Sequence, residues 1–502
     1  MGASTTAGIN FLVGELGKQI EQAALEAHSS TVVVTSSTTI SPIACRRWGC
    51  WLLGQFFVNA NVSGSSEDIA DYGEYVPLFL KYLLARSADL DTETLKAIVE
   101  ALKSLSKSVP VEILVGHIDF IRSCINLTAS DAKHRVNKQD KERLYDSATG
   151  QFILPLFRIP KALESLFPIF IHALMNGSVD MRETAATSIG ELAIMTETPL
   201  LKPYLIKTTG PLIRVVGDRF PSNVKFAILE TLSILLQKGG VGLKAFVPQL
   251  QTTFVKSLSD PSKQVRSRAS GCLGILVPMS TRLDPLLTEL SLGVQGAESS
   301  AICVSFAEGI SSVLKAAGSK ASEEVLDKIS RALLVTTVSE DEQVRSASAE
   351  TLGTLSQLYT SSRQVSNLLL DLMPPGGGNS SLAASGEHWT STAGRLMSCG
   401  TVLQCSGDLG ADIQDEVLDL FQSAFSDDRV SIRVAVCSAI AIMATTVPSV
   451  DNAAQEQLCV TILQRFGSTL ASAATRTGLA DDSLEVRRAA VSAMKQVPLD
   501  LL

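Results

Sequence analysis

The sequence predicts an all-α fold, a solenoid of stacked helix pairs, because one short pattern recurs along the chain at a nearly constant spacing. The pattern is an acidic or turn residue, then Val-Arg or a close variant, then Ala, then Leu or Ile at helical spacing. Strand-like alternation bounded by hairpin turns is not found, apart from a lone valine run at Thr31–Thr35. The copies of the pattern carry the basic residues Arg182, Lys225, Arg266, Arg345, Arg433 and Arg487.

The spacing of these basic residues gives the length of the repeat. From Arg182 to Lys225 is 43 positions, and from Lys225 to Arg266 is 41. HEAT repeats, in which two helices form one unit, have about 40–47 residues. The predicted fold class is therefore an α-solenoid of HEAT, or armadillo-type, repeats.

The longer intervals predict repeats in which the pattern has degenerated. The interval of 79 positions that leads to Arg345 and the interval of 88 that leads to Arg433 each correspond to two repeats. Degenerate copies are expected at Ser299–Leu314 and Trp389–Leu403. The last interval, 54 positions to Arg487, implies an insertion.

The charged residues of the pattern have a predicted structural role. An Asp between two helices can cap exposed N–H groups of the second helix. An Arg in the first turn of that helix opposes the helix dipole, so we expect it to reach a carboxylate, most plausibly the Asp of a neighbouring repeat. The alternative is a basic stripe that binds a partner. The predicted ladder of charged residues comprises Asp180, Arg182, Lys225, Asp260, Arg266, Asp341, Arg345, Asp428, Arg433, Asp482 and Arg487.

Apolar periodicity predicts the remaining helices and a division of the chain. First helices of repeats are expected at Pro160–Leu174, which ends at the helix stop Asn176-Gly177, and at Leu243–Leu258, Val325–Val335 and Ile413–Phe425. Residues 1–155 are expected to form divergent helical repeats with Ser/Thr-rich and basic loops. Residues 156–502 form the regular array, with a Pro/Gly/Ser loop at 374–387. Helices of the first region are expected at Phe11–Ala27, Ile43–Asn59, Tyr75–Arg86, Thr92–Lys107 and Val111–Leu127.

Composition excludes several classes of protein. The formal charge is −8, whereas a protein that binds nucleic acid with its whole surface is normally basic. Nine cysteines occur at irregular spacing without a C-x-x-C, so a disulfide framework is not expected and a reducing compartment fits best. Two uncharged stretches, Trp48–Ser66 and Val434–Val450, are interpreted as buried helices, because both contain polar residues and the second is too short for a membrane span.

No constellation of residues predicts catalysis or a cofactor. Gly240–Ala245 matches G-x-G-x-x-A, but a helix precedes it where a dinucleotide loop needs a strand, so the glycines are interpreted as a helix stop. The five histidines do not pair with each other or with cysteines at metal-ligand spacing. We therefore expect a non-catalytic protein with no metal or cofactor.

One stretch goes beyond a generic repeat. Thr209–Arg214, Gly217–Pro221 and Phe246–Phe254 closely resemble the C-terminal region of the Gcn translational activator family, the very large HEAT protein of eukaryotic general amino-acid control that senses stalled ribosomes. Agreement is clear over Ile159–Leu290, weakens to about Leu358, and is faint elsewhere. Since the family's amino-terminal and elongation-factor-3-like regions are absent, the chain resembles a fragment or a truncated gene product.

The resemblance implies a function and partners. Members of this family bind translating or collided ribosomes, and their C-terminal region binds the RWD domain of the kinase that phosphorylates the alpha subunit of initiation factor 2. The chain is therefore expected to be a cytosolic, ribosome-associated scaffold. The family depends on an arginine for kinase binding, and the candidates for partner contact are Arg214, Asp218 and Arg219.

A basic segment offers a second contact. It is either a solvated loop or a site for ribosomal RNA phosphates, because the family is basic in the corresponding loop. Its residues are Lys133, Arg135, Lys138, Lys141 and Arg143.

A different HEAT-type adaptor is the alternative function. A tubulin-binding TOG array or a receptor for transport cargo would share the architecture. TOG arrays place Trp and Lys in the turns along one edge. We expect none of the three tryptophans here, Trp48, Trp51 and Trp389, in a repeat turn.

Overall fold

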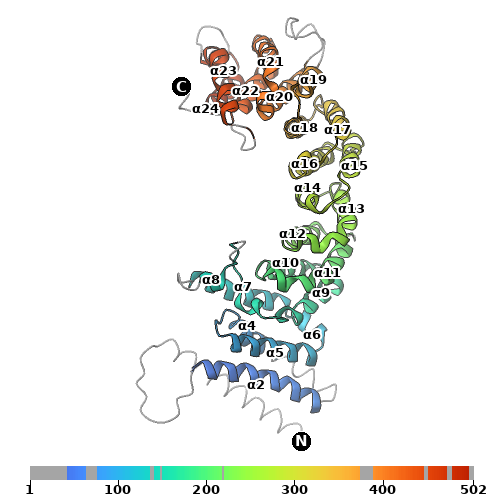
Figure 1. The fold of residues 1–502 in the computed structure, drawn as a ribbon, viewed down its shortest axis with the longest axis vertical. Coiled ribbons are helices and arrows are strands. Elements are labelled where there is room, and N and C mark those ends of the chain that lie inside the picture. Colours follow the sequence, from blue (N-terminus) through green and yellow to red (C-terminus); the bar gives the residue numbers. More distant parts are fainter. Residues whose placement is uncertain are drawn as a thin grey trace, which may run out of the picture. The chain divides into compact units, whose positions relative to one another are not determined.

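A computed structural model describes residues 42–63, 76–135, 141–146, 150–217, 220–373, 388–445, 450, 452–471 and 478–496 of the 502-residue chain. The predicted helix Phe11–Ala27 and the predicted loop at 374–387 lie outside these ranges. Over the described ranges the chain is helical, with one isolated antiparallel bridge between Tyr145 and Phe152. The predicted all-α HEAT solenoid is confirmed. The chain divides into two compact units, Met1–Leu243 and Lys244–Leu502. Figure 1 labels the helices along the chain.

The first unit contains ten described α-helices. They are α2 (Pro42–Ser63), α4 (Val76–Leu84), α5 (Thr92–Ser108), α6 (Val111–Val115), α7 (Ile118–His134), α8 (Lys141–Leu144), α9 (Phe167–Asn176), α10 (Val179–Ile194), α11 (Thr198–Val216) and α12 (Ser222–Gly239). Helix α2 packs along α5, where Arg46 pairs with Asp89 at 3.0 Å and Arg47 with Asp91 at 2.6 Å. The pairs α9–α10 and α11–α12 form regular repeats.

The second unit is a regular array of six helix pairs in its described residues. The pairs are α13 (Val247–Ser257) with α14 (Lys263–Leu276), α15 (Leu283–Gln295) with α16 (Ser300–Ala317), α17 (Glu323–Thr336) with α18 (Glu342–Ser356), α19 (Ser362–Leu372) with α20 (Trp389–Ser406), α21 (Ala411–Ala424) with α22 (Val430–Met443), and α23 (Asn452–Ala471) with α24 (Leu484–Gln496). The first helix of each pair is called the A helix below and the second the B helix. Both predicted degenerate copies are B helices, α16 and α20.

Two predicted helices have different bounds in the structure. The segment Val111–Leu127 is interrupted, since α6 ends at Val115 with Gly116 as its C-cap, and α7 begins at Ile118. Gly is a poor helix former, so the chain can break there at little cost. The helix predicted from Pro160 begins only at Phe167, because Lys161 has a left-handed backbone with φ 66° and a short 3-10 turn follows it. Its predicted end at Asn176-Gly177 is confirmed.

The B helices of neighbouring repeats pack more extensively than the A helices do. Close approach is possible because several B helices carry a glycine where they face the next one. A Cβ atom at Gly274 would lie 2.8 Å from the carbonyl oxygen of Ser312, and one at Gly353 would lie 2.7 Å from Cγ2 of Thr401. Both distances are too short for a real side chain. The glycines are Gly190, Gly274, Gly353 and Gly400, and each lies eight positions after Arg182, Arg266, Arg345 or Thr392.

Threonine hydroxyls add a polar link between neighbouring B helices. Thr231 Oγ1 of α12 donates to the carbonyl oxygen of Ala186 in α10 at 2.6 Å. Thr351 Oγ1 of α18 lies 3.1 Å from the Ala307 carbonyl oxygen of α16, and it shares its proton with the Ala347 carbonyl of its own helix at 2.7 Å. Because these groups are buried, the hydrogen bonds fix the spacing of the helices as well as satisfying the hydroxyls.

Two described segments, Ser222–Ser257 and Ser300–Ala317, have the length and apolar composition that a membrane crossing would need. About half of the most apolar window in each is buried within the protein, as is common for core helices of water-soluble folds. Length and composition alone are weak evidence for a membrane span.

The glycine contact predicts opposite effects for two substitutions in α14. Gly274→Ala forces its new methyl group against the Ser312 carbonyl, and we expect a loss of about 1–3 kcal/mol in the free energy of unfolding. Gly271→Ala in the same helix meets no atom within 4 Å and should gain up to about 1 kcal/mol through helix propensity. Urea unfolding followed by circular dichroism measures both. Equal effects of the two substitutions would contradict the close packing of B helices.

Candidate partner-binding surfaces

The arginine of the repeat pattern binds the turn that precedes its own helix. Nη1 of Arg266 donates to the carbonyl oxygens of Asp260 and Pro261, both at 2.9 Å. Arg345 donates in the same way to Ser339 at 2.9 Å and Glu340 at 2.7 Å. Arg433 binds the carbonyls of Asp427 and Asp428, and Arg487 those of Asp481 and Asp482. In these four arginines the acceptors lie six and five positions before the arginine.

This geometry corrects the predicted ladder of charged pairs. The end of the A helix leaves carbonyl groups without helical partners, and it carries the negative end of the helix dipole. A guanidinium group there satisfies two acceptors at once, so the arginine does not need a carboxylate. Among these arginines, Arg433 alone also binds a carboxylate of the next repeat, with Nε 2.7 Å and Nη2 3.0 Å from the oxygens of Asp481.

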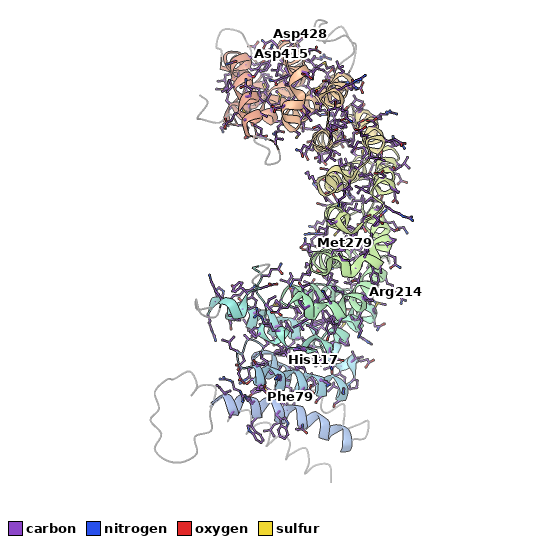
Figure 2. All side chains as sticks on the ribbon, viewed as in Figure 1. Phe79, His117, Arg214, Met279, Asp415 and Asp428 are labelled. Carbon is purple, nitrogen blue, oxygen red and sulfur yellow. The ribbon has the colours of Figure 1, made fainter. Side chains whose placement is uncertain are left out.

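The acidic residues of the pattern also differ from the prediction. The residue six positions before the arginine accepts a hydrogen bond from the backbone N–H two positions on, as in an Asx turn. Asp427 and Asp481 have this role and are buried, whereas the predicted Asp428 (Figure 2) and Asp482 are their exposed neighbours. Asp260 has the predicted turn position, with its carboxylate 2.9 Å from the Ser262 nitrogen.

The remaining predicted members of the ladder lie at helix starts. Asp341 caps α18 by accepting from the Gln343 nitrogen at 2.8 Å. In α10 the cap is Ser178, and Asp180 is an exposed residue of the first turn. Arg182 donates to the carbonyls of Gly177 and Leu174, and Lys225 is half-buried in the first turn of α12.

The ionic contacts of the last two repeats perturb the turn carboxylates. Burial alone would raise the pKa of Asp481, but hydrogen bonds from Arg433 and from the Ser483 N–H outweigh burial and lower the pKa below its ordinary value. In Asp427 burial is likewise outweighed by bonds from the Arg429 side chain and backbone, so its pKa is also lowered. Both residues are therefore ionised and structural at neutral pH.

Helix α11 carries an exposed basic face, which we call the α11 face. It consists of Lys202, Pro203, Ile206, Lys207 and Arg214, all exposed. Ile206 is 61% exposed, although its neighbours along the buried side, such as Leu205, are almost completely covered. Helix α11 contains no acidic residue, and Pro211 cannot donate the helical hydrogen bond to the Lys207 carbonyl. The face therefore combines positive charge with one exposed aliphatic side chain.

Of the three predicted contact residues, the structure describes only Arg214. It lies in the last turn of α11, on the side of the A helices and away from α10 and α12 (Figure 2). Asp218 and Arg219 lie outside the described residues. Phe220, just beyond them, is half-buried under the guanidinium of Arg182, whose carbon lies 4.4 Å from the ring centroid. Sequence reasoning missed Lys202, Ile206 and Lys207. They share the helix face of Arg214, because repeated steps of three or four positions along a helix return to the same face.

The basic segment begins inside a helix and not in a loop. Lys133 is an exposed residue of α7 that lies 5.0 Å above the ring of Phe152, and Arg135 is the exposed C-cap of the same helix. Lys141 and Arg143 belong to the short helix α8, where Lys141 is exposed and the side chain of Arg143 is not described. Lys138 lies outside the described residues.

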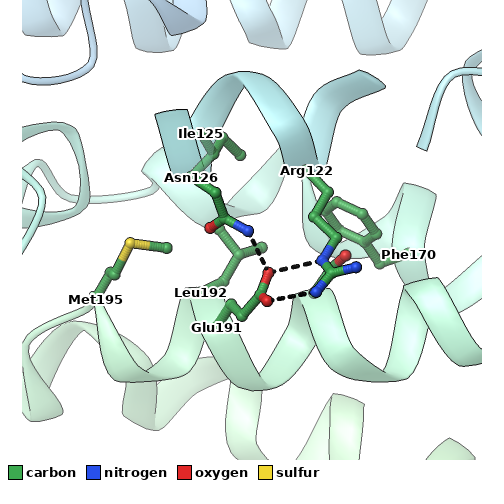
Figure 3. Close-up of a pocket in the computed structure, with 8 residues that line it drawn as sticks. Arg122, Ile125, Asn126, Phe170, Glu191, Leu192 and Met195 are labelled. Atoms are coloured by element: carbon green, nitrogen blue, oxygen red, sulfur yellow. Dashed lines mark hydrogen bonds and ion pairs between the residues drawn. The ribbon is translucent and has the colours of Figure 1, made fainter. Parts of the chain in front are cut away.

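A small cavity between α7 and α10, partly open to solvent, is structural. It is lined by a bidentate ion pair in which Arg122 Nε and Nη2 lie 2.9 and 2.7 Å from the carboxylate of Glu191 (Figure 3). Asn126 donates to the same carboxylate at 2.9 Å. The three side chains satisfy one another, and Phe170 and Met195 close the space around them, so the cavity is not a ligand site.

The structure also tests three smaller sequence interpretations. Helix α12 ends at Gly239 and Gly240 has φ 46°, which confirms the helix stop in the G-x-G-x-x-A segment. Within the described ranges there is no group of three or more His, Cys, Asp or Glu residues that could hold a metal ion. The tryptophans lie in helices and not in repeat turns, as expected: Trp48 and Trp51 belong to α2, and Trp389 is the first residue of α20, 37% exposed and 5.8 Å from the Arg345 guanidinium.

Stacked A and B helices with arginine-anchored turns define an α-solenoid protein of the HEAT-repeat class. Two family models match the chain, at residues 6–161 and 284–473, and both are described as "Stalled ribosome sensor GCN1-like, HEAT repeats". The chain belongs to this GCN1-like family. Its resemblance extends further than the sequence motifs indicated, since the models match before Ile159 and beyond Leu358, where agreement was expected to be faint.

Known relatives are similar over much or all of the chain. Protein ILITYHIA of Arabidopsis thaliana is 32% identical over 515 residues, which is 100% of this chain and 18% of that protein. The human stalled ribosome sensor GCN1 is 30% identical over 74% of this chain and 13% of its own length. The eIF-2-alpha kinase activator GCN1 of Saccharomyces cerevisiae is 32% identical over 58% of this chain and 10% of its own. The chain thus spans less than a fifth of the relatives it matches.

Similarity to the two solved structures named here is low, with TM-scores below 0.5. Kap121p bound to Nup53p has a TM-score of 0.49 and 14% identity over 98% of this chain and 47% of its own. A structure on microtubule plus-end tracking by XMAP215, CLIP-170 and EB1 has a TM-score of 0.34 and 18% identity over 41% of this chain and 84% of its own.

The Arg433–Asp481 contact predicts how acid affects the last repeats. Asp481→Asn removes a buried charge and leaves Arg433 half-compensated, so we expect a loss of about 3 kcal/mol in the free energy of unfolding at pH 7. Because the folded pKa of Asp481 lies below its unfolded value of about 3.9, this stabilisation is complete above that value and is lost as the pH falls through the folded pKa.

Urea unfolding at pH 7 and pH 3 measures this effect. The difference between the unaltered chain and the Asp481→Asn variant should shrink at pH 3. The matched control is Asp428→Asn, an exposed residue of the preceding turn, with an expected change within about 0.5 kcal/mol. A constant difference across the two pH values would show that Asp481 is not held ionised by Arg433.

Proposed function

We propose that this chain is a non-catalytic scaffold that binds ribosomes and the RWD domain of the kinase that phosphorylates the alpha subunit of initiation factor 2. The site of action would be the cytosol. Membership of the GCN1-like family supports the proposal, since relatives are named a stalled ribosome sensor and eIF-2-alpha kinase activators. The observation in this chain that carries it is the α11 face.

The α11 face has the chemistry of a protein-binding surface. Lys202, Lys207 and Arg214 give it a single sign of charge, which steers an acidic partner toward it. Ile206, exposed among them, provides the apolar contact that interfaces use as an energetic anchor. An acidic domain surface with one apolar socket would therefore fit it.

The proposed mechanism is tethering. A scaffold that holds both the ribosome and the kinase raises the effective concentration of one at the other without new chemistry. The basic residues at the end of α7, among them Lys133 and Arg135, would supply the ribosome contact through RNA phosphates. The two surfaces lie on different helices, so one chain could engage both partners.

A double substitution in the α11 face tests the kinase contact. The variant Ile206→Ser with Arg214→Glu should weaken binding of the isolated RWD domain at least about tenfold, because it removes the anchor and reverses a charge. Isothermal titration calorimetry with the whole chain measures the affinity. The control is Leu370→Ser with Arg363→Glu, an exposed aliphatic and an exposed arginine of α19, which should leave the affinity unchanged.

Two results would count against the proposal. If the α11 variant binds the RWD domain as tightly as the control does, the site assignment is wrong. If the unaltered chain does not bind the RWD domain at all, the scaffold function is wrong for this chain.

A further inference from the structure

The second unit contains a polar groove that runs across three consecutive B helices, α14, α16 and α18, which lie side by side (Figure 1). Most of its lining is small or hydroxylated, and its charged residues have both signs. It does not overlap the α11 face, which belongs to the first unit. The charged residues that line it are Lys263, Arg266, Glu308, Lys315 and Glu350.

Glu308 is a half-buried acid in this groove whose carboxylate makes no hydrogen bond or salt bridge with another described residue. Burial raises the pKa of Glu308, and repulsion from Glu350 on the next B helix, α18, raises it further. Lys263 and Arg266 lower it. A carboxylate that is partly withdrawn from water and faces a second carboxylate is unfavourable for the fold on its own. A cation between Glu308 and Glu350 would relieve both effects.

Arg266 also lines the groove and is 8% exposed. Its Nε donates to Ser305 Oγ and its Nη1 to two carbonyls, whereas Nη2 donates to no described residue. In the equivalent Arg433, both Nε and Nη2 donate hydrogen bonds to the carboxylate of Asp481. Arg266 is therefore a buried cation with an unused donor, at the end of the groove where α14 begins.

The walls leave room for a polypeptide backbone. Gly271 and Ala347 project little into the groove, and the hydroxyls of Ser267 and Ser346 bind no other described residue. An extended chain needs this combination, because its amides must find acceptors and donors along their path. A nucleic acid would bring phosphates against Glu308 and Glu350.

We propose that this groove binds an extended segment of a partner protein, with a lysine or arginine of the segment seated between Glu308 and Glu350. A carboxylate of the same segment would accept from Nη2 of Arg266. The groove is thus a peptide-binding site that is separate from the α11 face and does not depend on it.

A double-mutant cycle tests whether a basic side chain of the peptide binds between Glu308 and Glu350. The probe is a labelled ten-residue peptide of alternating small and charged residues, Ser-Lys-Gly-Glu-Ser repeated twice, and a second peptide in which Gln replaces each Lys. Fluorescence anisotropy with the whole chain, at about 0.15 M salt to screen surface charge, gives the affinities. The unaltered chain should bind the Lys peptide about tenfold more tightly than the Gln peptide.

The variant Glu308→Gln with Glu350→Gln should lose that preference, because the two changes remove the same contact. The control Glu416→Gln with Glu485→Gln alters two exposed acids of the same unit and should keep it. The melting temperature of the Glu308/Glu350 variant should stay the same or rise, since an unpaired half-buried charge is removed. A fall in melting temperature would assign Glu308 a structural role and overturn the proposal. A tenfold preference for the Lys peptide that survives in the Glu308/Glu350 variant would also overturn it. So would equal binding of both peptides by the unaltered chain.

Discussion

The structure depends on one recurring interaction, a guanidinium group that binds the two carbonyls at the turn between the helices of its own repeat. In four repeats of the second unit, Nη1 of the arginine bonds to acceptors six and five positions back. The contact satisfies groups that the end of the A helix leaves open, and it fixes the start of the B helix relative to that end. Since the side chain reaches backward along the chain, each of these four repeats is closed by its own residues.

The consequences follow along each B helix. Once its first turn is anchored, the residue eight positions on faces the next B helix, and glycine there lets the two backbones approach. Close packing of B helices puts the small and hydroxylated residues of α14, α16 and α18 at one surface, where the polar groove lies. The A helices pack less closely, and the α11 face with its exposed Ile206 lies on one of them. The polar groove and the α11 face thus differ in composition because the B helices pack closely and the A helices do not.

The spacing of basic residues was sufficient to predict the fold class and both degenerate repeats, and the motifs between Thr209 and Phe254 were sufficient to indicate the family. It was not sufficient to predict what the arginines bind, because a helix dipole argument favours any nearby negative charge and cannot distinguish a carboxylate from a carbonyl. The choice of Asp428 over Asp427 is an error of one position, which decides between an exposed and a buried side chain at a turn. The Arg-to-Gly spacing of eight was present in the sequence, but its meaning required the knowledge that B helices touch. Nothing local marked Glu308, since its environment is assembled from three repeats.

The central claim is that the arginine holds the turn through neutral carbonyls, and its most direct test is the replacement of Arg345 by Met. Arg345 is 4% exposed and binds Ser339 and Glu340, whereas Arg331 of the adjacent α17 is exposed and serves as the control. Amide hydrogen exchange should show faster opening of α17 and α18 in Arg345→Met, by about 1–3 kcal/mol, because two acceptors lose their donor. Exchange in Arg331→Met should match the unaltered chain. If the two variants exchange alike, the turn is held by something else and the account is contradicted.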